Sequence, residues 1–254
     1  MMASTSPHSE IVLETRGLTV TFGALRAVDG VDVRVRRGGI TSIIGPNGAG
    51  KSTFFNLVSG ALRPTAGEIW LEGSNVTGLA PYRLNARGLA RSFQITNLFA
   101  QSTVFENLRI AAQVLEPWHH GLLALSRSRR AETKAEELIE RFGLSARATE
   151  MAGHLSHGEQ RRLEIAVALA SEPRILILDE PTQGMSHTDT EEASRLVARL
   201  GQEMTVILIE HDIDLVMDLS HTVVVLHQGA KLAEGTPAEV RANKDVQIAY
   251  FGDH

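Results

Sequence analysis

The segment Ile40–Thr53 constrains this chain more than any other stretch, because it reads ITSIIGPNGAGKST. From Gly45 to Ser52 it matches the pattern G-x-x-x-x-G-K-[ST]. An apolar run typical of a buried strand precedes the pattern, and Phe54–Val58 continues as a helix. Glycines in such a turn let backbone N–H groups approach phosphate oxygens, and the helix N-terminus adds its positive dipole end. The segment therefore predicts a strand, a phosphate-binding loop and a helix.

We expect this loop to bind a nucleoside triphosphate. Lys51 would reach the β and γ phosphates, and the hydroxyl of Ser52 would ligate Mg²⁺. The alternative is a glycine-rich turn with a chance Lys-Ser pair, which the flanking strand and helix disfavour. The expected nucleotide-binding residues of the loop are Gly45, Pro46, Asn47, Gly48, Ala49, Gly50, Lys51, Ser52 and Thr53.

Composition limits the possible classes of protein. The chain has 254 residues, of which 43% are hydrophobic, enough for one large domain with a sizeable core. Its formal net charge of -5 gives no overall basic field, so we expect no nucleic-acid partner. Cysteine is absent from the sequence, which excludes disulfides and thiolate metal sites.

The N-terminal sequence MMASTSPHSE lacks the basic and apolar regions of a signal peptide. No stretch approaches the roughly 18 consecutive apolar residues that would span a bilayer. We therefore expect a cytoplasmic protein whose role at a membrane, if it has one, comes through partners.

The order of predicted elements indicates an α/β fold. Alternating apolar residues before the loop predict an antiparallel β layer, and Glu68–Glu72 adds a short strand. Helical periodicity follows from about Val104 to Ala170, with a charged amphipathic helix over Arg130–Phe142. The chain then returns to strands and helices. Their predicted ranges are Arg174–Leu178, Thr188–Leu200, Thr205–Ile209, Asp212–Leu219 and Thr222–Leu226, with a capping box at Thr236–Glu239.

These elements predict one domain over residues 1–254. Residues 1–94 and 171–254 would form a parallel sheet core with an antiparallel β flank. Residues 95–170 would form an inserted helical subdomain.

A second constellation, Asp179 and Glu180, ends the apolar run that begins at Ile175. The carboxyl ends of strands in open α/β sheets are where ligands bind. Asp179 would there hold Mg²⁺ or its water, and Glu180 would orient and deprotonate an attacking water. The alternative is that the paired acids merely end a strand in solvent. The phosphate loop upstream disfavours this alternative.

A third constellation is the segment Leu155–Gln160, which reads LSHGEQ. Ser156 and Glu159 predict a capping box, and a capped helix start also offers N–H donors to an anion. The segment resembles the signature motif of ABC-type ATPases, usually Leu-Ser-Gly-Gly-Gln, with His157 in place of the first glycine.

Further family motifs follow in order along the chain, and the resemblance gives them roles. Phe22 would stack on adenine, the alternative being a core residue of its strand. Gln94 would couple the Mg²⁺ site to membrane subunits, and His211 would contact the γ-phosphate of ATP. The resemblance implies that two such subunits pair head to tail, with Ser156 and Gly158 contacting the γ-phosphate held by the partner.

The fold implied is a P-loop NTPase of the ABC type, using ATP and Mg²⁺. The catalytic residues would be Glu180, His211, Lys51 and Gln94, and the metal ligands Ser52, Gln94 and Asp179. One departure concerns the loop after Thr182, where the family commonly has Ser-Ala-Leu-Asp and this chain has Gln183–Ser186. Ser186 thus stands in place of the interface aspartate, a change in the loop through which the family's subunits communicate across the pair.

The finer resemblance is to bacterial uptake ATPases for branched-chain amino acids and related amides such as urea. The segments that carry it are Phe93–Phe99, Thr103–Asn107, Leu155–Arg161, Pro181–Met185, Gly235–Glu239 and Ala249–Gly252. It implies a second ATPase subunit, two membrane permeases, an extracytoplasmic solute-binding protein and a place at the cytoplasmic face of the inner membrane.

Rival functions are the ATPase of a lipid or lipopolysaccharide exporter, a soluble ABC ATPase outside transport, and a P-loop kinase. The soluble class usually carries two ATPase domains or a long coiled-coil insert, and this chain has neither. The kinase leaves LSHGEQ unexplained. An exporter is the serious competitor, because the ATPase core separates import from export poorly.

Overall fold

The computed structural model describes residues 10–92, 98–116 and 128–251. The chain divides into two compact units. The first comprises Met1–Arg87 and Ser194–His254, and the second Gly88–Ala193.

The first unit contains an antiparallel sheet with the strand order β2-β1-β4-β5. The strands are β1 (Ile11–Phe22), β2 (Leu25–Arg36), β4 (Ala66–Leu71) and β5 (Ser74–Asn75). Along β2, Val31, Val33 and Val35 are buried between exposed polar residues, the alternation of a sheet with one core face. The predicted antiparallel layer is confirmed.

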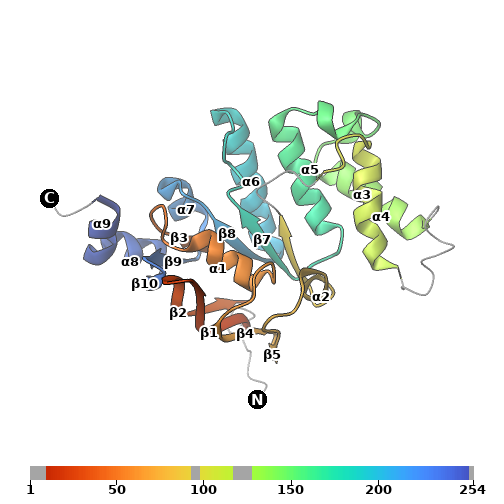
Figure 1. Ribbon diagram of the computed structural model, residues 1–254. Coiled ribbons are helices and arrows are strands. Elements are labelled where there is room, and N and C mark those ends of the chain that lie inside the picture. Colours follow the sequence, from red (N-terminus) through yellow and green to blue (C-terminus); the bar gives the residue numbers. More distant parts are fainter. Residues whose placement is uncertain (1–9, 93–97, 117–127, 252–254) are drawn as a thin grey trace, which may run out of the picture. The chain divides into compact units, whose positions relative to one another are not determined.

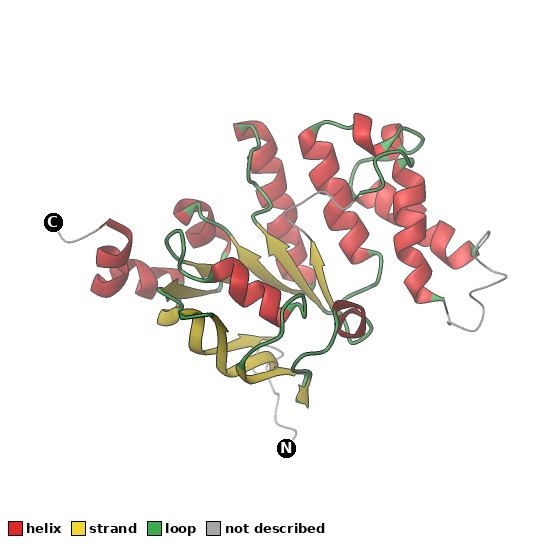
Figure 2. Ribbon diagram, in the orientation of Figure 1, coloured by secondary structure: helices red, strands yellow, loops and turns green. Residues whose placement is uncertain are grey.

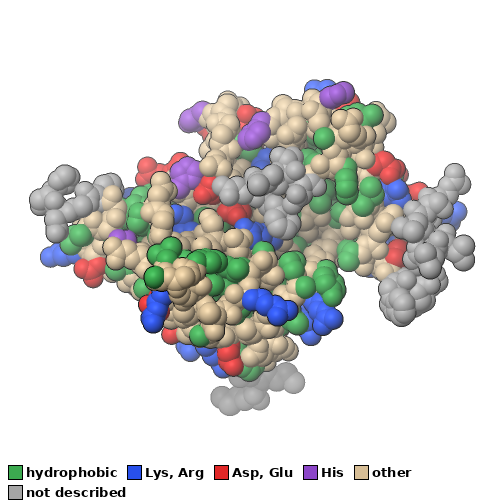
Figure 3. All heavy atoms as spheres, in the orientation of Figure 1, with side chains coloured by type: hydrophobic (Ala, Val, Ile, Leu, Met, Phe, Trp, Pro, Cys, Tyr) green, Lys and Arg blue, Asp and Glu red, His purple; other side chains and the backbone are tan. Residues whose placement is uncertain are grey.

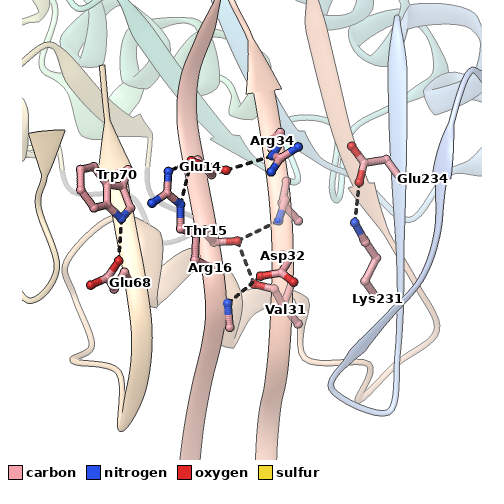
Figure 4. A network of polar contacts seen from close by, with 12 residues as sticks. Glu14, Thr15, Arg16, Val31, Asp32, Arg34, Glu68, Trp70, Lys231 and Glu234 are labelled. Atoms are coloured by element: carbon pink, nitrogen blue, oxygen red, sulfur yellow. Dashed lines mark hydrogen bonds and ion pairs between the residues drawn. The ribbon is translucent and has the colours of Figure 1, made fainter. Parts of the chain in front are cut away.

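Polar contacts link the strands of this sheet, as Figure 4 shows. The carboxylate of Glu14 accepts hydrogen bonds from Arg16 at 2.6 Å and Arg34 at 2.9 Å. These bonds, that from Arg16 first, lower the pKa of Glu14. The hydroxyl of Thr15 is buried and donates to the carbonyl of Val31 at 2.9 Å. The exposed arginine pairs add little stability, whereas the buried Thr15 bond satisfies a carbonyl that water does not reach.

Parallel strands form the second layer of the first unit. They are β3 (Ile40–Ile44), β8 (Thr205–Ile209) and β9 (Thr222–His227), with β10 (Ala230–Gly235) antiparallel to β9. β3 lies between β8 and β9 and is parallel to both. All five residues of β3 and of β8 are buried, the polar Thr41, Ser42 and Thr205 included, as is typical of parallel strands covered on both faces.

The helices of the first unit follow these strands (Figure 1). They are α1 (Lys51–Val58), α2 (Pro81–Asn85), α7 (Ile213–Leu219), α8 (Pro237–Ala242) and α9 (Lys244–Phe251). Thr236 and Glu239 form the predicted capping box at the start of α8. Val216 of α7, Val240 of α8 and Val246 of α9 are buried in one core cluster with residues of β3 and β9.

The second unit combines parallel strands with a helical region. Helices are drawn in red and strands in yellow in Figure 2. The strands β6 (Leu89–Ser92) and β7 (Ile175–Asp179) are parallel neighbours. The helices are α3 (Val104–Ala112), α4 (Arg129–Arg141), α5 (His157–Leu169) and α6 (His187–Glu203), with short 3-10 turns at Gln113–Leu115, Ser145–Arg147 and Ala152–His154. The boundary between the units falls within α6.

The predicted helices of this region are confirmed. Within the unit, α3 packs against α4 and α5. The prediction that residues 95–170 are a subdomain inserted into a single domain stays a prediction.

The alternative interpretation of Phe22, a core residue that continues the alternation of Leu18 and Val20 along β1, is wrong. Leu18 and Val20 are 0% and 4% exposed, but Phe22 is 51% exposed. The pairing of β1 with β2 shifts register between Leu18 and Val20 and again between Val20 and Thr21. Such irregularities change which face of the sheet a side chain occupies, so simple alternation fails at this end of β1.

Among the described residues, no helix combines the length and apolar character needed to cross a bilayer. The surface drawn in Figure 3 carries basic and acidic side chains interspersed, without a large field of one sign. This agrees with the small net charge of the chain.

Candidate nucleotide-binding site

The loop after β3 is packed so closely that two of its residues must be glycine. A Cβ on Gly45 would lie 2.2 Å from the carbonyl oxygen of Leu226 in β9. A Cβ on Gly50 would lie 2.4 Å from the carbonyl oxygen of Ala27, and Gly50 has φ of 98°. Any larger residue would push the loop away from β2 and β9. These contacts hold the loop backbone at the carboxyl end of β3.

Lys51 is enclosed by the loop and is only 8% exposed. Its ammonium group donates to the carbonyl oxygen of Gly45 at 2.6 Å and to that of Pro46 at 3.1 Å. The loop also closes on itself through a bond from the N–H of Ala49 to the carbonyl of Pro46, at 3.1 Å. The cation is thereby held at the loop, where the motif places it for phosphate binding.

The loop leads directly into α1, whose N-cap is Gly50. No acidic residue lies in the first turn of this helix, so nothing there opposes an anion. Ser52, the expected Mg²⁺ ligand, is exposed on that turn, and Thr53 is half-buried. The start of α1 therefore has the electrostatics of an anion site.

His211 follows β8, which pairs in parallel with β3. It therefore lies at the same edge of the sheet as the phosphate loop. Its side chain is 56% exposed, and its Nδ1 is 3.7 Å from a carboxylate oxygen of the buried Glu210. The N–H of His211 donates to the same oxygen at 3.2 Å. The fold thus places His211 at this edge, while its contact with the γ-phosphate stays a prediction.

The structure excludes one of the two interpretations of Phe22. With about half its surface exposed, Phe22 is not a core residue. It opposes Leu25, itself 65% exposed, where β1 turns into β2. The stacking of adenine on Phe22 remains a prediction.

In the second unit, Asp179 is the last residue of β7 and is 1% exposed. One oxygen of its carboxylate, Oδ2, accepts a hydrogen bond from the guanidinium of Arg91 at 2.6 Å. The other oxygen, Oδ1, has no hydrogen-bond partner among the described residues. A buried carboxylate oxygen left in this state suits a hard cation such as Mg²⁺.

Glu180 has φ of 45°, in the left-handed region that residues with side chains rarely adopt. Arg161 of α5 explains how this conformation is held. Its guanidinium donates to the carbonyl of Asp179 at 2.5 Å and to that of Pro181 at 3.3 Å, on both sides of Glu180. A third bond, to Glu164 at 2.7 Å, balances its charge. Backbone strain fixed in this way is concentrated at functional sites in proteins.

The helix α5 begins as its sequence predicts. The hydroxyl of Ser156 accepts from the N–H of Glu159 at 3.3 Å, and the carboxylate of Glu159 accepts from the N–H of Ser156 at 2.9 Å. The latter bond is the main cause that lowers the pKa of Glu159. The capping box is confirmed, while the contacts of Ser156 and Gly158 with a partner's nucleotide are not tested by it.

The start of α5 meets the start of α6 at Gly158. A Cβ on Gly158 would lie 2.9 Å from Oδ1 of Asp189. The other oxygen of Asp189 accepts from the hydroxyl of Ser186 at 2.7 Å. Ser186, which stands where the family commonly has an aspartate, is thus tied to Asp189 in the first turn of α6.

The fold therefore gathers the expected residues into two groups. The phosphate loop and His211 belong to the first unit, and Asp179, Glu180, Ser156 and Gly158 to the second. Gln94 lies outside the described residues. Nowhere in the described ranges do three or more His, Cys, Asp or Glu residues cluster as a metal site would require. The metal set expected here also uses a hydroxyl and an amide.

Comparison with protein families identifies the chain. The family model described as "ABC transporter" matches residues 28–183, more than half of the sequence. The chain belongs to the ABC transporter family. The C-terminal part of this cassette, residues 230–254, also matches the model of a "branched-chain amino acid ATP-binding cassette transporter".

Relatives of the cassette agree with this assignment. It is 43% identical to the high-affinity branched-chain amino acid transport ATP-binding protein BraF of Pseudomonas aeruginosa, covering 96% of this chain and 99% of that one. It is 42% identical to the protein LivG of Salmonella typhimurium, with the same coverage. A solved ATP-binding cassette in its ADP conformation superposes with a TM-score of 0.84 at 30% identity, covering 96% of this chain and 100% of that one. The cassette is an ATPase that binds nucleotide.

Sequence reasoning gave no role to three residues of this site. Arg91 and Arg161 are bound to Asp179 and its loop, and Tyr250 of α9 packs on the core cluster that contains Ile44. Burial raises the pKa of Tyr250 to about 12, partly offset by a hydrogen bond from the Gly45 backbone. The only sequence signal for Tyr250 was its place in the terminal Ala249–Gly252 segment.

Proposed function

We propose that this cassette hydrolyses ATP to drive the import of branched-chain amino acids across the inner membrane. The observation that supports this choice of solute is the match of residues 230–254 to the branched-chain amino acid model. The names of BraF and LivG, which align over almost the whole chain, support it. The lipid exporter and the soluble ATPase have no such support.

The proposed reaction is attack of water on the γ-phosphate of ATP, in line with the departing ADP. Lys51 and the loop N–H groups hold the phosphate charge, and His211 contacts the γ-phosphate. Glu180 orients the water and accepts its proton. The two carbonyls bound by Arg161 fix the backbone of Glu180, so its carboxylate starts from a defined position.

Mg²⁺ would be held by Ser52, Asp179 and Gln94. When bound, it would neutralise the negative charge that develops on the phosphate. The buried Oδ1 of Asp179 is the observation that favours this role. In this chain, Asp179 contributes the carboxylate and Ser52 the hydroxyl on the first turn of α1.

The cassette would work as one of a pair of ATPase subunits, alike or different, on two permeases at the cytoplasmic face of the membrane. Each site would be completed by Ser156 and Gly158 of the other subunit, which bring the N-terminal end of α5 to the γ-phosphate. ATP binding would close the pair and hydrolysis would open it. The region of Gln94 would pass this motion to the permeases, and an extracytoplasmic binding protein would deliver the solute.

Isolation of the native cassette from detergent-solubilised membranes tests this proposal. We expect two permeases and an amino-acid-binding protein to accompany it, as an importer requires. Recovery of lipid-export components or of ribosomes in their place would contradict the proposal. Tyr82→Phe, a substitution at an exposed residue of α2, serves as a control and should be recovered with the same partners as the wild type.

A further inference from the structure

The ion pair between Arg91 and Asp179 is buried and close. The two side chains are 9% and 2% exposed, and their charged atoms are 2.6 Å apart. Arg91 is the third residue of β6 and pairs in register with Ile177 of β7, two positions before Asp179. Parallel neighbouring strands therefore bring the arginine alongside the carboxylate, and the pair is built into the sheet of the second unit.

Arg91 occupies only part of the binding capacity of the aspartate. It bonds to Oδ2, while Oδ1 is buried and has no partner among the described residues. The backbone carbonyl of Asp179 is bound separately by Arg161. A carboxylate buried for stability alone would have both oxygens bonded, because an unsatisfied buried oxygen is costly. One oxygen is thus held by a resident cation and the other is left for a ligand.

We propose that Arg91 is a built-in counter-cation that keeps divalent metal ions off Asp179 until nucleotide phosphates arrive. This inference rests on the proposed metal role of Asp179. Without nucleotide, the guanidinium neutralises the carboxylate and repels a second cation at Oδ1. The phosphates of ATP bring enough negative charge to offset this repulsion, so metal binding becomes conditional on nucleotide.

The strength of the repulsion sets the size of the expected effect. By Coulomb's law, the repulsion between the single charge of Arg91 and a divalent cation about 6 Å away weakens metal binding roughly tenfold, even with the dielectric of water. The local dielectric beside buried groups is lower, so the effect there is larger. Arg91 also orients Asp179, which favours metal binding, so the measured effect is the repulsion less the benefit of that orientation.

The test is a titration of the nucleotide-free, full-length cassette with Mn²⁺, a substitute for Mg²⁺ whose free form is measured by electron paramagnetic resonance. We expect weak binding to the wild type and at least about tenfold tighter binding to Arg91→Gln. Arg91→Lys, which keeps the positive charge, should remain within about threefold of the wild type. Asp179→Asn in the Arg91→Gln background should remove the added affinity.

Stability gives an independent measurement on the same samples. Loss of Arg91 leaves Asp179 as an uncompensated buried charge, so Arg91→Gln should melt at a lower temperature than the wild type. Mn²⁺ should raise the melting temperature of this variant more than that of the wild type. Arg91→Met, which keeps the aliphatic stem and lacks the charge, is the second neutral variant, and either one decides the question.

Two outcomes overturn the proposal and separate it from the proposed function. Unchanged or weaker Mn²⁺ binding in either neutral variant, provided that the variant folds, removes the counter-cation role of Arg91, while Asp179 can still govern metal binding in the presence of ATP. If Asp179→Asn leaves Mn²⁺ binding unaltered in the variants and in the ATP complex, then Asp179 is not a metal residue, and the metal role proposed above fails as well.

Discussion

Glu180 and its neighbours show how single side chains determine this site. The left-handed backbone of Glu180 is held by Arg161, which binds the carbonyls on both sides of it. Arg161 comes from α5, the helix that also carries Ser156. One buried guanidinium therefore joins the signature helix to the loop of the proposed catalytic base, and the position of that base depends on the helix.

We expect Glu180→Gln to bind ATP with normal affinity but to hydrolyse it about 10² to 10⁴ times more slowly, because the amide does not accept the proton of the attacking water. Steady-state phosphate release and equilibrium binding of a fluorescent ATP analogue measure the two properties. Glu137→Gln, on the exposed face of α4, is a matched control. Wild-type turnover in Glu180→Gln would remove Glu180 from the base role.

The residues of the loop motif were predictable because a local pattern specifies them. Lys51, Ser52 and Asp179 stand at positions that a short motif and a strand end define. Arg91 and Arg161 were not predictable in the same way. Their roles arise from pairing between β6 and β7 and from the packing of α5, which no local pattern contains.

The elements were predicted well where their residues are apolar and less well at their ends. Thr205–Ile209 is the strand that the sequence predicted, since a buried parallel strand is a continuous apolar run. Predicted helix boundaries differ by a few residues, as at α6, which runs from His187 to Glu203 instead of Thr188–Leu200. Capping residues determine where a helix begins and ends. The capping box of α5 could be predicted because Ser156 and Glu159 are only three residues apart in the sequence.

The last helix, α9, gives a prediction about pH. Burial raises the pKa of Tyr250 from 10.0 to about 12 in the folded cassette. The unfolded chain therefore releases this proton first as the pH rises, so the stability of the fold falls between these two values. Below pH 10 the contribution is fully present. We expect Tyr250→Phe to lose less stability than the wild type over this range, measured by urea denaturation at several pH values.

The sequence contains a control for that experiment, because Tyr82 is the only other tyrosine and is 69% exposed. Tyr82→Phe should keep the alkaline loss of the wild type. If Tyr82→Phe abolishes the loss and Tyr250→Phe does not, the burial of Tyr250 has no part in it.

For the whole molecule, the order of motifs identified the family, because the phosphate loop, the LSHGEQ segment, Asp179-Glu180 and His211 are distributed along almost the entire chain. The pairing of two subunits is a different kind of claim. A single chain carries half of each proposed composite site, so neither its sequence nor its fold contains the interface.

The composite site predicts separate effects for two substitutions. Ser156→Arg should leave ATP binding by the isolated cassette within about twofold of the wild type, because its own phosphate loop is untouched. It should block hydrolysis, since a bulky cation replaces the hydroxyl at the tip of α5. Lys51→Ala should lose ATP binding itself. Loss of binding in isolated Ser156→Arg would argue against a contact made across the pair.

The most direct test of the account is the rate of ATP hydrolysis by the cassette reconstituted in proteoliposomes with its permeases and solute-binding protein. We predict that binding protein loaded with a branched-chain amino acid raises the rate several-fold over the unloaded protein, and that Glu180→Gln abolishes the rise. A rate that responds to a lipid substrate instead, or to no loaded binding protein at all, would contradict the account.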